Sequence, residues 1–282
     1  MGTEHEKKEI REPSVAGSFY PGDKSSLSRE VEKLLEMAGK RALKGKILGV
    51  IVPHAGYVFS GLVAAHAYRQ LEGLKFDVAV LIGPSHRAYH PEASIYPGRA
   101  FKTPLGLVEV DADIARELAS RDPLMRLTAS GHTGEHSIEV QLPFLQKVMP
   151  DIKIVPIALG IQNRVVCEKI AGSLKVVLKG KKAILIASSD LSHFHGYDEA
   201  VRLDRIVLKH LESFDATSLL MDLETDTCEA CGGGAIATVL LAAKSMGGNS
   251  VEILKYANSG DAIGDRRSVV GYAAAAVMGP AT

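Results

Sequence analysis

Three apolar runs in this sequence are each followed closely by a histidine, and this pattern restricts the fold more than any other feature. The runs cover residues 47–52, 78–82 and 183–187, and the histidines that follow them are His54, His86 and His193. Continuous apolar runs bounded by turn residues are typical of strands that are buried in a parallel sheet. Ligands of open α/β sheets bind at the carboxyl ends of the strands, so the pattern predicts a site at that edge.

Strands alternate with helices along the rest of the chain, which favours an α/β fold. We expect a single domain over residues 1–282, with a central, mostly parallel sheet flanked by helices. Apolar spacing predicts helices at 27–38, 60–71, 138–149, 165–178, 200–211 and 235–246, and further strands at 152–159, 251–257 and 269–277.

Two stretches differ from this alternation. Residues 1–12 form a charged leader that we expect to be frayed. Residues 93–110 contain two short apolar segments around a Thr103-Pro104-Leu105-Gly106 turn, which predicts a β excursion away from the main sheet.

The composition excludes several classes of protein. Lys and Arg together number 33, as do Asp and Glu, so there is no excess of basic residues to favour nonspecific nucleic-acid binding. No apolar run reaches the ~18 residues that suggest a membrane-spanning helix, and the N-terminus lacks a signal-peptide core. The three cysteines are too few for a disulfide framework. A cytoplasmic protein is therefore expected, without a nucleic-acid or membrane partner.

The histidines at the predicted sheet edge differ from the others in the chain. A single histidine is more often structural or solvated than catalytic, and His66 and His210 within helices are expected to be so. His54 and His86 instead follow apolar strands directly. Imidazole is a common ligand for zinc, copper, iron and nickel, so histidines gathered along one edge favour a metal or catalytic site.

The segment Cys228-Glu-Ala-Cys231-Gly-Gly-Gly is a second candidate. A zinc ribbon requires another cysteine pair, which the sequence lacks. The glycines allow the backbone to come close to a ligand or to a helix, and simple packing of a helix start explains them equally well.

Two pairs of polar residues complete the candidates. Glu135 or His136 could act in catalysis or could cap the helix that begins near Ile138, and both interpretations remain open. Asp190 precedes His193 by three residues, an arrangement that suits a carboxylate orienting an imidazole. We expect parallel strands to end at His54, His86 and Asp190 on one edge of one sheet.

Several longer motifs, in order, match a known family. They are Ala16-Gly-Ser-Phe-Tyr-Pro21, Pro53-His-Ala-Gly-Tyr-Val-Phe-Ser-Gly61, Gly83-Pro-Ser-His86, Glu135-His-Ser-Ile-Glu139 and Ser188-Ser-Asp190. On these motifs the chain resembles, nearly end to end, the Memo family, also called AmmeMemoRadiSam system protein B. The resemblance implies a fold similar to the class III extradiol dioxygenases. Those enzymes hold non-haem iron with two histidines and a glutamate, and use a further histidine as acid or base.

Carried over by position, the resemblance implies a role for four residues. His54 and His86 match the two metal histidines, Cys231 matches the third ligand, and His193 matches the acid–base histidine. A thiolate in place of the carboxylate departs from the dioxygenases. We expect catalytic roles for His193, Asp190 and His136.

The resemblance also implies a cofactor and a function. The expected cofactor is a divalent iron, zinc or copper ion, in a metal-dependent, dioxygenase-like oxidoreductase that acts on an unknown small molecule. The alternative is a non-enzymatic module that binds a peptide or a small anion beside a vestigial metal site. The family's second name implies a pathway shared with a radical-SAM protein and an AMMECR1-like protein.

Overall fold

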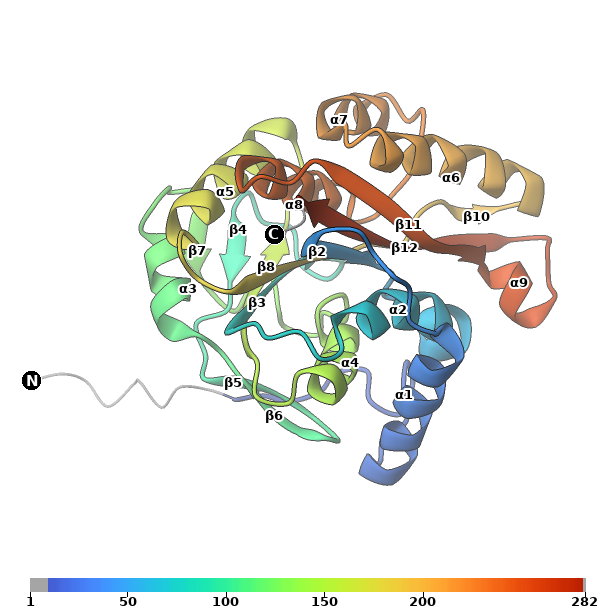
Figure 1. Ribbon diagram of the computed structural model, residues 1–282, viewed down its shortest axis with the longest axis horizontal. Coiled ribbons are helices and arrows are strands. Elements are labelled where there is room, and N and C mark those ends of the chain that lie inside the picture. Colours follow the sequence, from blue (N-terminus) through green and yellow to red (C-terminus); the bar gives the residue numbers. More distant parts are fainter. Residues whose placement is uncertain (1–9, 281–282) are drawn as a thin grey trace, which may run out of the picture.

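The computed structural model describes residues 10–280, and a nine-stranded sheet forms the centre of this described part (Figure 1). The four central strands are parallel to one another, and each is buried along almost all of its length. Burial of this extent explains their continuous apolar sequences. The predicted α/β fold is confirmed, with a sheet that is parallel at its centre. The four strands lie in the order β2 (Lys46–Val52), β9 (Ala183–Ser188), β3 (Val78–Pro84) and β8 (Lys153–Leu159).

Antiparallel pairing appears on both sides of the parallel centre. On one side, β12 (Val269–Gly279) pairs with β2, and β11 (Ser250–Asn258) and β10 (His193–His195) pair with β12. On the other side, β4 (Ala93–Ile95) is antiparallel to β8 and parallel to β7 (Met125–Leu127). The sheet is therefore mixed at its edges.

Side chains of the central strands alternate between two apolar layers, as the period of two in a strand requires. In β3, Val78, Val80 and Ile82 belong to one layer, whereas Ala79 and Leu81 belong to the other. Helices cover both layers (Figure 1). The first layer contains residues of α3 (Ala112–Ala119), α5 (Arg164–Val177), α6 (Tyr197–Glu212), α7 (Ala216–Glu224) and α8 (Gly233–Ser245), and the second contains residues of α1 (Lys24–Ala38), α2 (Tyr57–Leu71) and α4 (Leu142–Val148).

The predicted helices are present, with ends that differ by a few residues. α1 begins at Lys24 because the Asp23 carboxylate accepts a hydrogen bond from the Ser26 N–H and caps the helix. The segment predicted as a helix at 138–149 is divided into a 3₁₀ turn, η1 (Glu139–Gln141), and α4, with a proline in the first turn of α4. The short helices α7 and α9 (Ser259–Ile263) were not predicted.

The predicted β excursion at residues 93–110 is partly wrong. β4 is fully buried and joins the main sheet, because its three residues pair with β8. Only β5 (Ala100–Thr103) and β6 (Gly106–Glu109) leave the sheet, as an antiparallel hairpin.

The predicted leader ends earlier than residue 12. Residues 1–9 lie outside the described part of the chain, but β1 (Ile10–Arg11) pairs with β5. Arg11 is ordered because its guanidinium is buried and lies 2.6 Å from the Glu139 carboxylate. Glu139 also accepts hydrogen bonds from the Ser14 and Val15 N–H groups and from the Tyr20 hydroxyl.

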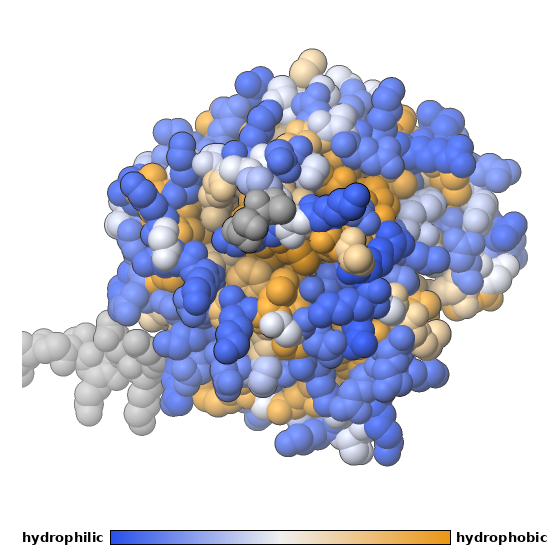
Figure 2. Space-filling model, viewed as in Figure 1, coloured by the Kyte–Doolittle hydropathy of each residue, from blue (hydrophilic) through white to orange (hydrophobic). Residues whose placement is uncertain are grey.

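The surface view and the helix lengths add two observations. Figure 2 shows apolar side chains gathered near the middle of the face viewed, with hydrophilic residues framing them. Within residues 10–280, no helix combines the length and the apolar character that crossing a membrane requires.

The buried Arg11–Glu139 ion pair gives a prediction about stability. Glu139→Gln should lower the free energy of unfolding by ~3–5 kcal/mol, because it leaves the Arg11 charge buried without its partner. Urea denaturation followed by circular dichroism measures the change.

The matched control is Glu199→Gln, which removes the exposed partner of Arg202. This change should lower the free energy of unfolding far less than Glu139→Gln does, because an exposed ion pair contributes little to stability. If the two variants are equally stable, the buried pair does not hold the N-terminal segment in place.

Candidate metal centre

Three parallel strands deliver polar residues to one edge of the sheet. His54, His86 and Asp190 each lie two residues beyond the end of a strand, following β2, β3 and β9 respectively. β9 pairs in parallel with both β2 and β3. The predicted placement of the three residues on one edge of one sheet is therefore confirmed.

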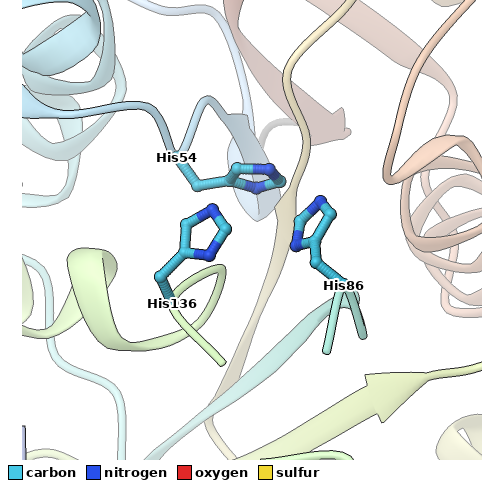
Figure 3. Close-up of side chains that lie close together, drawn as sticks. All are labelled: His54, His86 and His136. Atoms are coloured by element: carbon cyan, nitrogen blue, oxygen red, sulfur yellow. The ribbon is translucent and has the colours of Figure 1, made fainter. Parts of the chain in front are cut away.

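A third histidine, from a separate loop, completes a cluster at this edge. Ligand nitrogens of His54, His86 and His136 all lie within 4.8 Å of one another. The ring of His136 is 4.8 Å from that of His86 and 5.3 Å from that of His54, measured between centroids. Figure 3 shows the three rings converging from three different segments. This group has the residue types and the spacing to hold a metal ion.

Hydrogen bonds around His54 determine which ring nitrogen faces the cluster. Nδ1 of His54 lies 3.0 Å from the Ser188 hydroxyl, and that hydroxyl lies 2.6 Å from the Ser137 carbonyl oxygen. A carbonyl only accepts, so Ser188 donates its proton to Ser137, and His54 Nδ1 must donate to Ser188. The Gln141 amide donates to the same hydroxyl. His54 Nε2 therefore presents a lone pair to the cluster.

The Glu135 carboxylate determines the orientation of the His86 ring in the same way. Its carboxylate lies 3.0 Å from His86 Nδ1 and accepts hydrogen bonds from the N–H groups of His86, His136 and Ser137. Burial favours the protonated acid, but the hydrogen bonds from His86 and Ser137, together with the His86 charge, hold the pKa of Glu135 well below its usual range. An ionised Glu135 requires Nδ1 of His86 to donate, which leaves Nε2 free to bind a metal.

Burial keeps two members of the cluster neutral. Burial, assisted by the neighbouring His86 charge, lowers the pKa of His54 to about 3. Burial lowers the pKa of His136 to about 4, and the repulsion that a protonated His54 would exert adds to this lowering. Both rings therefore carry no charge at neutral pH, as metal ligation requires.

The two cysteines of the Cys-x-x-Cys segment lie in different surroundings. Cys231 Sγ is 3.1 Å from His54 Nε2, and the Cys231 N–H donates to the Asp190 carbonyl. Burial, with the Asp190 charge adding to it, raises the pKa of the Cys231 thiol. Cys228 is buried with the apolar layer that contains α7 and α8. Cys231 thus lies beside the histidine cluster, and Cys228 lies in the core.

Asp190 and His193 both follow β9, and both line a cleft at this edge of the sheet. The Asp190 carboxylate accepts hydrogen bonds from the N–H groups of His54 and Ala55, so it fixes the backbone that carries His54. Its other oxygen is 3.9 Å from His54 Nε2. Burial raises the pKa of Asp190, and the hydrogen bond from the His54 N–H opposes this rise. His193 begins β10.

Two clefts meet at His193. The first, which we call the apolar cleft, has a volume of about 470 Å³ and includes His136, Asp190 and His193 among its lining residues. The second, the thiol cleft, has a volume of about 580 Å³ and reaches Cys231 and His193. The apolar cleft is also lined by Phe19, Phe59, Phe194, Ile263, Val270 and Tyr272.

Sequence reasoning missed the residues that orient the metal-facing rings. Ser188 and Gln141 are ordinary polar residues in the sequence, and their contacts join positions 47 or more residues apart. The sequence suggests that Glu135 is a helix cap or a catalytic group, whereas in the structure it is the hydrogen-bond partner of His86. Its place directly before His136 in a polar loop was the one available signal.

The chain is similar to known proteins along nearly its whole length. The family model described as "Memo-like protein" matches residues 11–276. A MEMO1 family protein of Methanosarcina mazei is 39% identical over 269 residues, covering 94% of this chain and 98% of that protein. A MEMO1 family protein of Sulfolobus acidocaldarius is 40% identical over 278 residues, covering 93% and 97%.

A solved structure supports the fold. The crystal structure of an uncharacterized protein from Escherichia coli K12 superimposes with a TM-score of 0.57 at 13% identity. The match covers 81% of this chain and 99% of that protein. At this identity the likeness concerns the fold alone.

The lowered histidine pKa values predict how the stability of the metal-free protein depends on pH. Burial lowers the pKa of His132 to about 3, as it does for His54. Above pH ~6.5 the unfolded chain gains no proton at these residues, and stability is at its full value. As the pH falls toward 3, the unfolded state binds protons that the folded state does not. Each histidine then removes up to ~1.4 kcal/mol per pH unit.

Urea midpoints between pH 7.5 and 4.5 test this expectation. His132→Gln is the matched variant, because a glutamine amide can also donate to the Ser94 carbonyl that His132 Nε2 contacts at 2.8 Å. Its stability should depend less steeply on pH than that of the wild type. Identical slopes in the two proteins would contradict the assignment of a neutral, buried His132.

Proposed function

The chain belongs to the Memo family, and from this membership and its convergent histidines we propose that it is a metal-dependent oxidoreductase acting on a small molecule. The proposal rests on one observation above all. Nitrogens of His54, His86 and His136 come within 4.8 Å of one another at the carboxyl edge of a parallel sheet. This edge is where ligands of α/β proteins bind.

We assign His54, His86 and Cys231 to the metal. The orientation of the two histidines supports this assignment, since each donates a hydrogen bond through Nδ1 and keeps the Nε2 lone pair for a metal. Cys231 is supported by its 3.1 Å contact with His54 Nε2. Three protein ligands leave coordination positions open, as catalytic metal sites require.

The protonation of the metal-free site supports this assignment. Since His54 Nε2 carries a lone pair and burial keeps Cys231 protonated, the thiol donates its proton toward Nε2 across the 3.1 Å contact. His54 and Cys231 would hold a metal ion in place of that proton. Loading the site should therefore release a proton, and the affinity should fall as the pH drops.

The donor set favours a transition metal over magnesium or calcium. Thiolate and imidazole suit iron, zinc and copper, whereas the harder ions prefer oxygen ligands. When bound, such an ion would polarise a substrate oxygen or exchange electrons with the substrate.

The remaining polar residues are assigned to the substrate side. His193 lines both clefts and is proposed to move a proton to or from the substrate. His136, in contact with the ring of Phe19 at 4.8 Å, is proposed as a second proton-handling group. Asp190 accepts a hydrogen bond from the His54 N–H and contributes a charge near His136 and His193. The cleft volumes suit a small molecule.

Cysteine variants test the ligand assignment. Protein purified anaerobically and loaded with Fe²⁺, Zn²⁺ or Cu⁺ should bind one ion, measured by elemental analysis after gel filtration. Cys231→Ser should weaken binding by at least ~10-fold, since it replaces a soft ligand by a poor one. Cys228→Ser is the matched control and should bind as the wild type does, because Cys228 is buried in the core.

Histidine variants separate ligands from proton-handling groups. His54→Ala and His86→Ala should abolish binding, whereas His193→Ala should keep its metal. Metal loss in His136→Ala equal to that in His54→Ala would place His136 in the ligand set. A wild type that binds no metal but retains a peptide would support the alternative of a binding module.

A further inference from the structure

Phe194 has a backbone conformation that aromatic residues rarely adopt. Its φ is +64°, in the left-handed region that favours glycine. Such strain persists only where the surrounding structure imposes it, and it gathers at ligand sites and clamps. The side chain is 76% exposed, so burial of the ring does not compensate for the strain.

A single carboxylate holds the two residues on either side of Phe194. Glu229 Oε2 accepts a hydrogen bond of 3.2 Å from the His193 N–H, and Glu229 Oε1 lies 2.8 Å from His195 Nε2. The pairing of this segment with β12 is irregular, with a register shift between His193 and His195. Pairing in the sheet therefore does not set the geometry of Phe194 by itself, and the Glu229 carboxylate supplies a second constraint.

The strained conformation places the ring of Phe194 at the apolar cleft. Phe194 lines this cleft together with Phe19, Val270 and Tyr272. Its ring is 5.6 Å from that of His193, at 68°. A Phe194 with an ordinary negative φ would direct its side chain elsewhere, and the cleft would lose an aromatic wall beside His193.

We propose that Glu229 is a positioning residue for the apolar cleft. It fixes His193 and His195, holds Phe194 in the left-handed conformation, and so provides an aromatic wall for an apolar, ring-shaped part of a ligand. The lining of the cleft identifies this class of ligand, because aromatic and aliphatic side chains line it beside His136, Asp190 and His193. The inference goes beyond the proposed metal centre and does not require the metal.

The test uses the metal-free full-length protein and a neutral, apolar fluorescent probe, N-phenyl-1-naphthylamine. Binding is measured by titration in the wild type, Glu229→Ala, Glu229→Gln, Phe194→Gly and the double variant Glu229→Ala/Phe194→Gly. Glu224→Ala is the matched control. Glu224 is an exposed carboxylate at the end of α7 that lines the thiol cleft rather than the apolar cleft.

Loss of the aromatic wall should weaken probe binding by roughly two- to tenfold, the range expected for one aromatic contact. Phe194→Gly and Glu229→Ala should both show this loss, and the double variant should bind no more weakly than Phe194→Gly alone. Glu229→Gln should restore most of the binding, because its amide oxygen still accepts from the His193 N–H. Glu224→Ala should bind as the wild type does.

Thermal unfolding distinguishes positioning from a merely structural role. Phe194→Gly should raise the melting temperature or leave it unchanged, since glycine adopts a φ of +64° without strain. This variant removes an exposed ring and should fold even if Glu229→Ala does not.

Three results would each overturn the proposal. They are unchanged probe binding in Phe194→Gly, additive losses in the double variant, and a lower melting temperature in Phe194→Gly. A further variant, Ile263→Glu, places a charge in the apolar cleft. Probe binding that survives this change would show that the probe binds elsewhere, and this result would overturn the proposal as well. Because every measurement is made without metal, failure of the proposed metal centre does not affect the outcome.

Discussion

The parallel pairing of β9 with both β2 and β3 is the constraint on which the candidate site depends. Parallel strands end at a common edge, so residues far apart in the sequence meet there without any direct interaction to draw them together. His54, His86 and Asp190 each lie two residues beyond the end of one of these three strands. The sheet therefore determines where His54 and His86 lie. The surrounding hydrogen bonds determine the orientation of their rings.

A second level of organisation comes from the loop that carries Glu135 and His136. Hydrogen bonds to two other segments fix this loop. Arg11 donates to the carbonyl oxygens of His132 and Glu135, Ser137 donates to the Pro84 carbonyl, and Glu135 accepts from the His86 N–H. The buried ion pair at the N-terminus is thus connected to the site through the backbone of this loop. Residues that look like part of a leader in the sequence hold a histidine of the cluster in place.

The sequence predicted those features that depend on local pattern. The run before His54 has the length and apolar character of a buried strand, and the rule on carboxyl edges then places His54 and His86 together. It could not predict that β4 joins the main sheet, because three residues carry too little pattern to identify a partner. Nor could it identify Arg11, whose importance arises from a contact with Glu139, 128 positions away. The Cys-x-x-Cys pattern marks the segment as a candidate, and the resemblance to the family assigns Cys231 to the metal.

The glycines after Cys231 connect the fold to the chemistry of the site. The sequence left open whether they allow approach to a ligand or simple packing, and the structure favours close packing of backbone against backbone. A side chain at Gly232 would collide with the Ser188 carbonyl at the end of β9, and one at Gly234 would lie 2.6 Å from Gln162 Cβ. Gln162 in turn donates to the Cys231 carbonyl and accepts from the Gly234 N–H. Larger residues here would push the loop away from β9. The thiol would then move away from His54 Nε2.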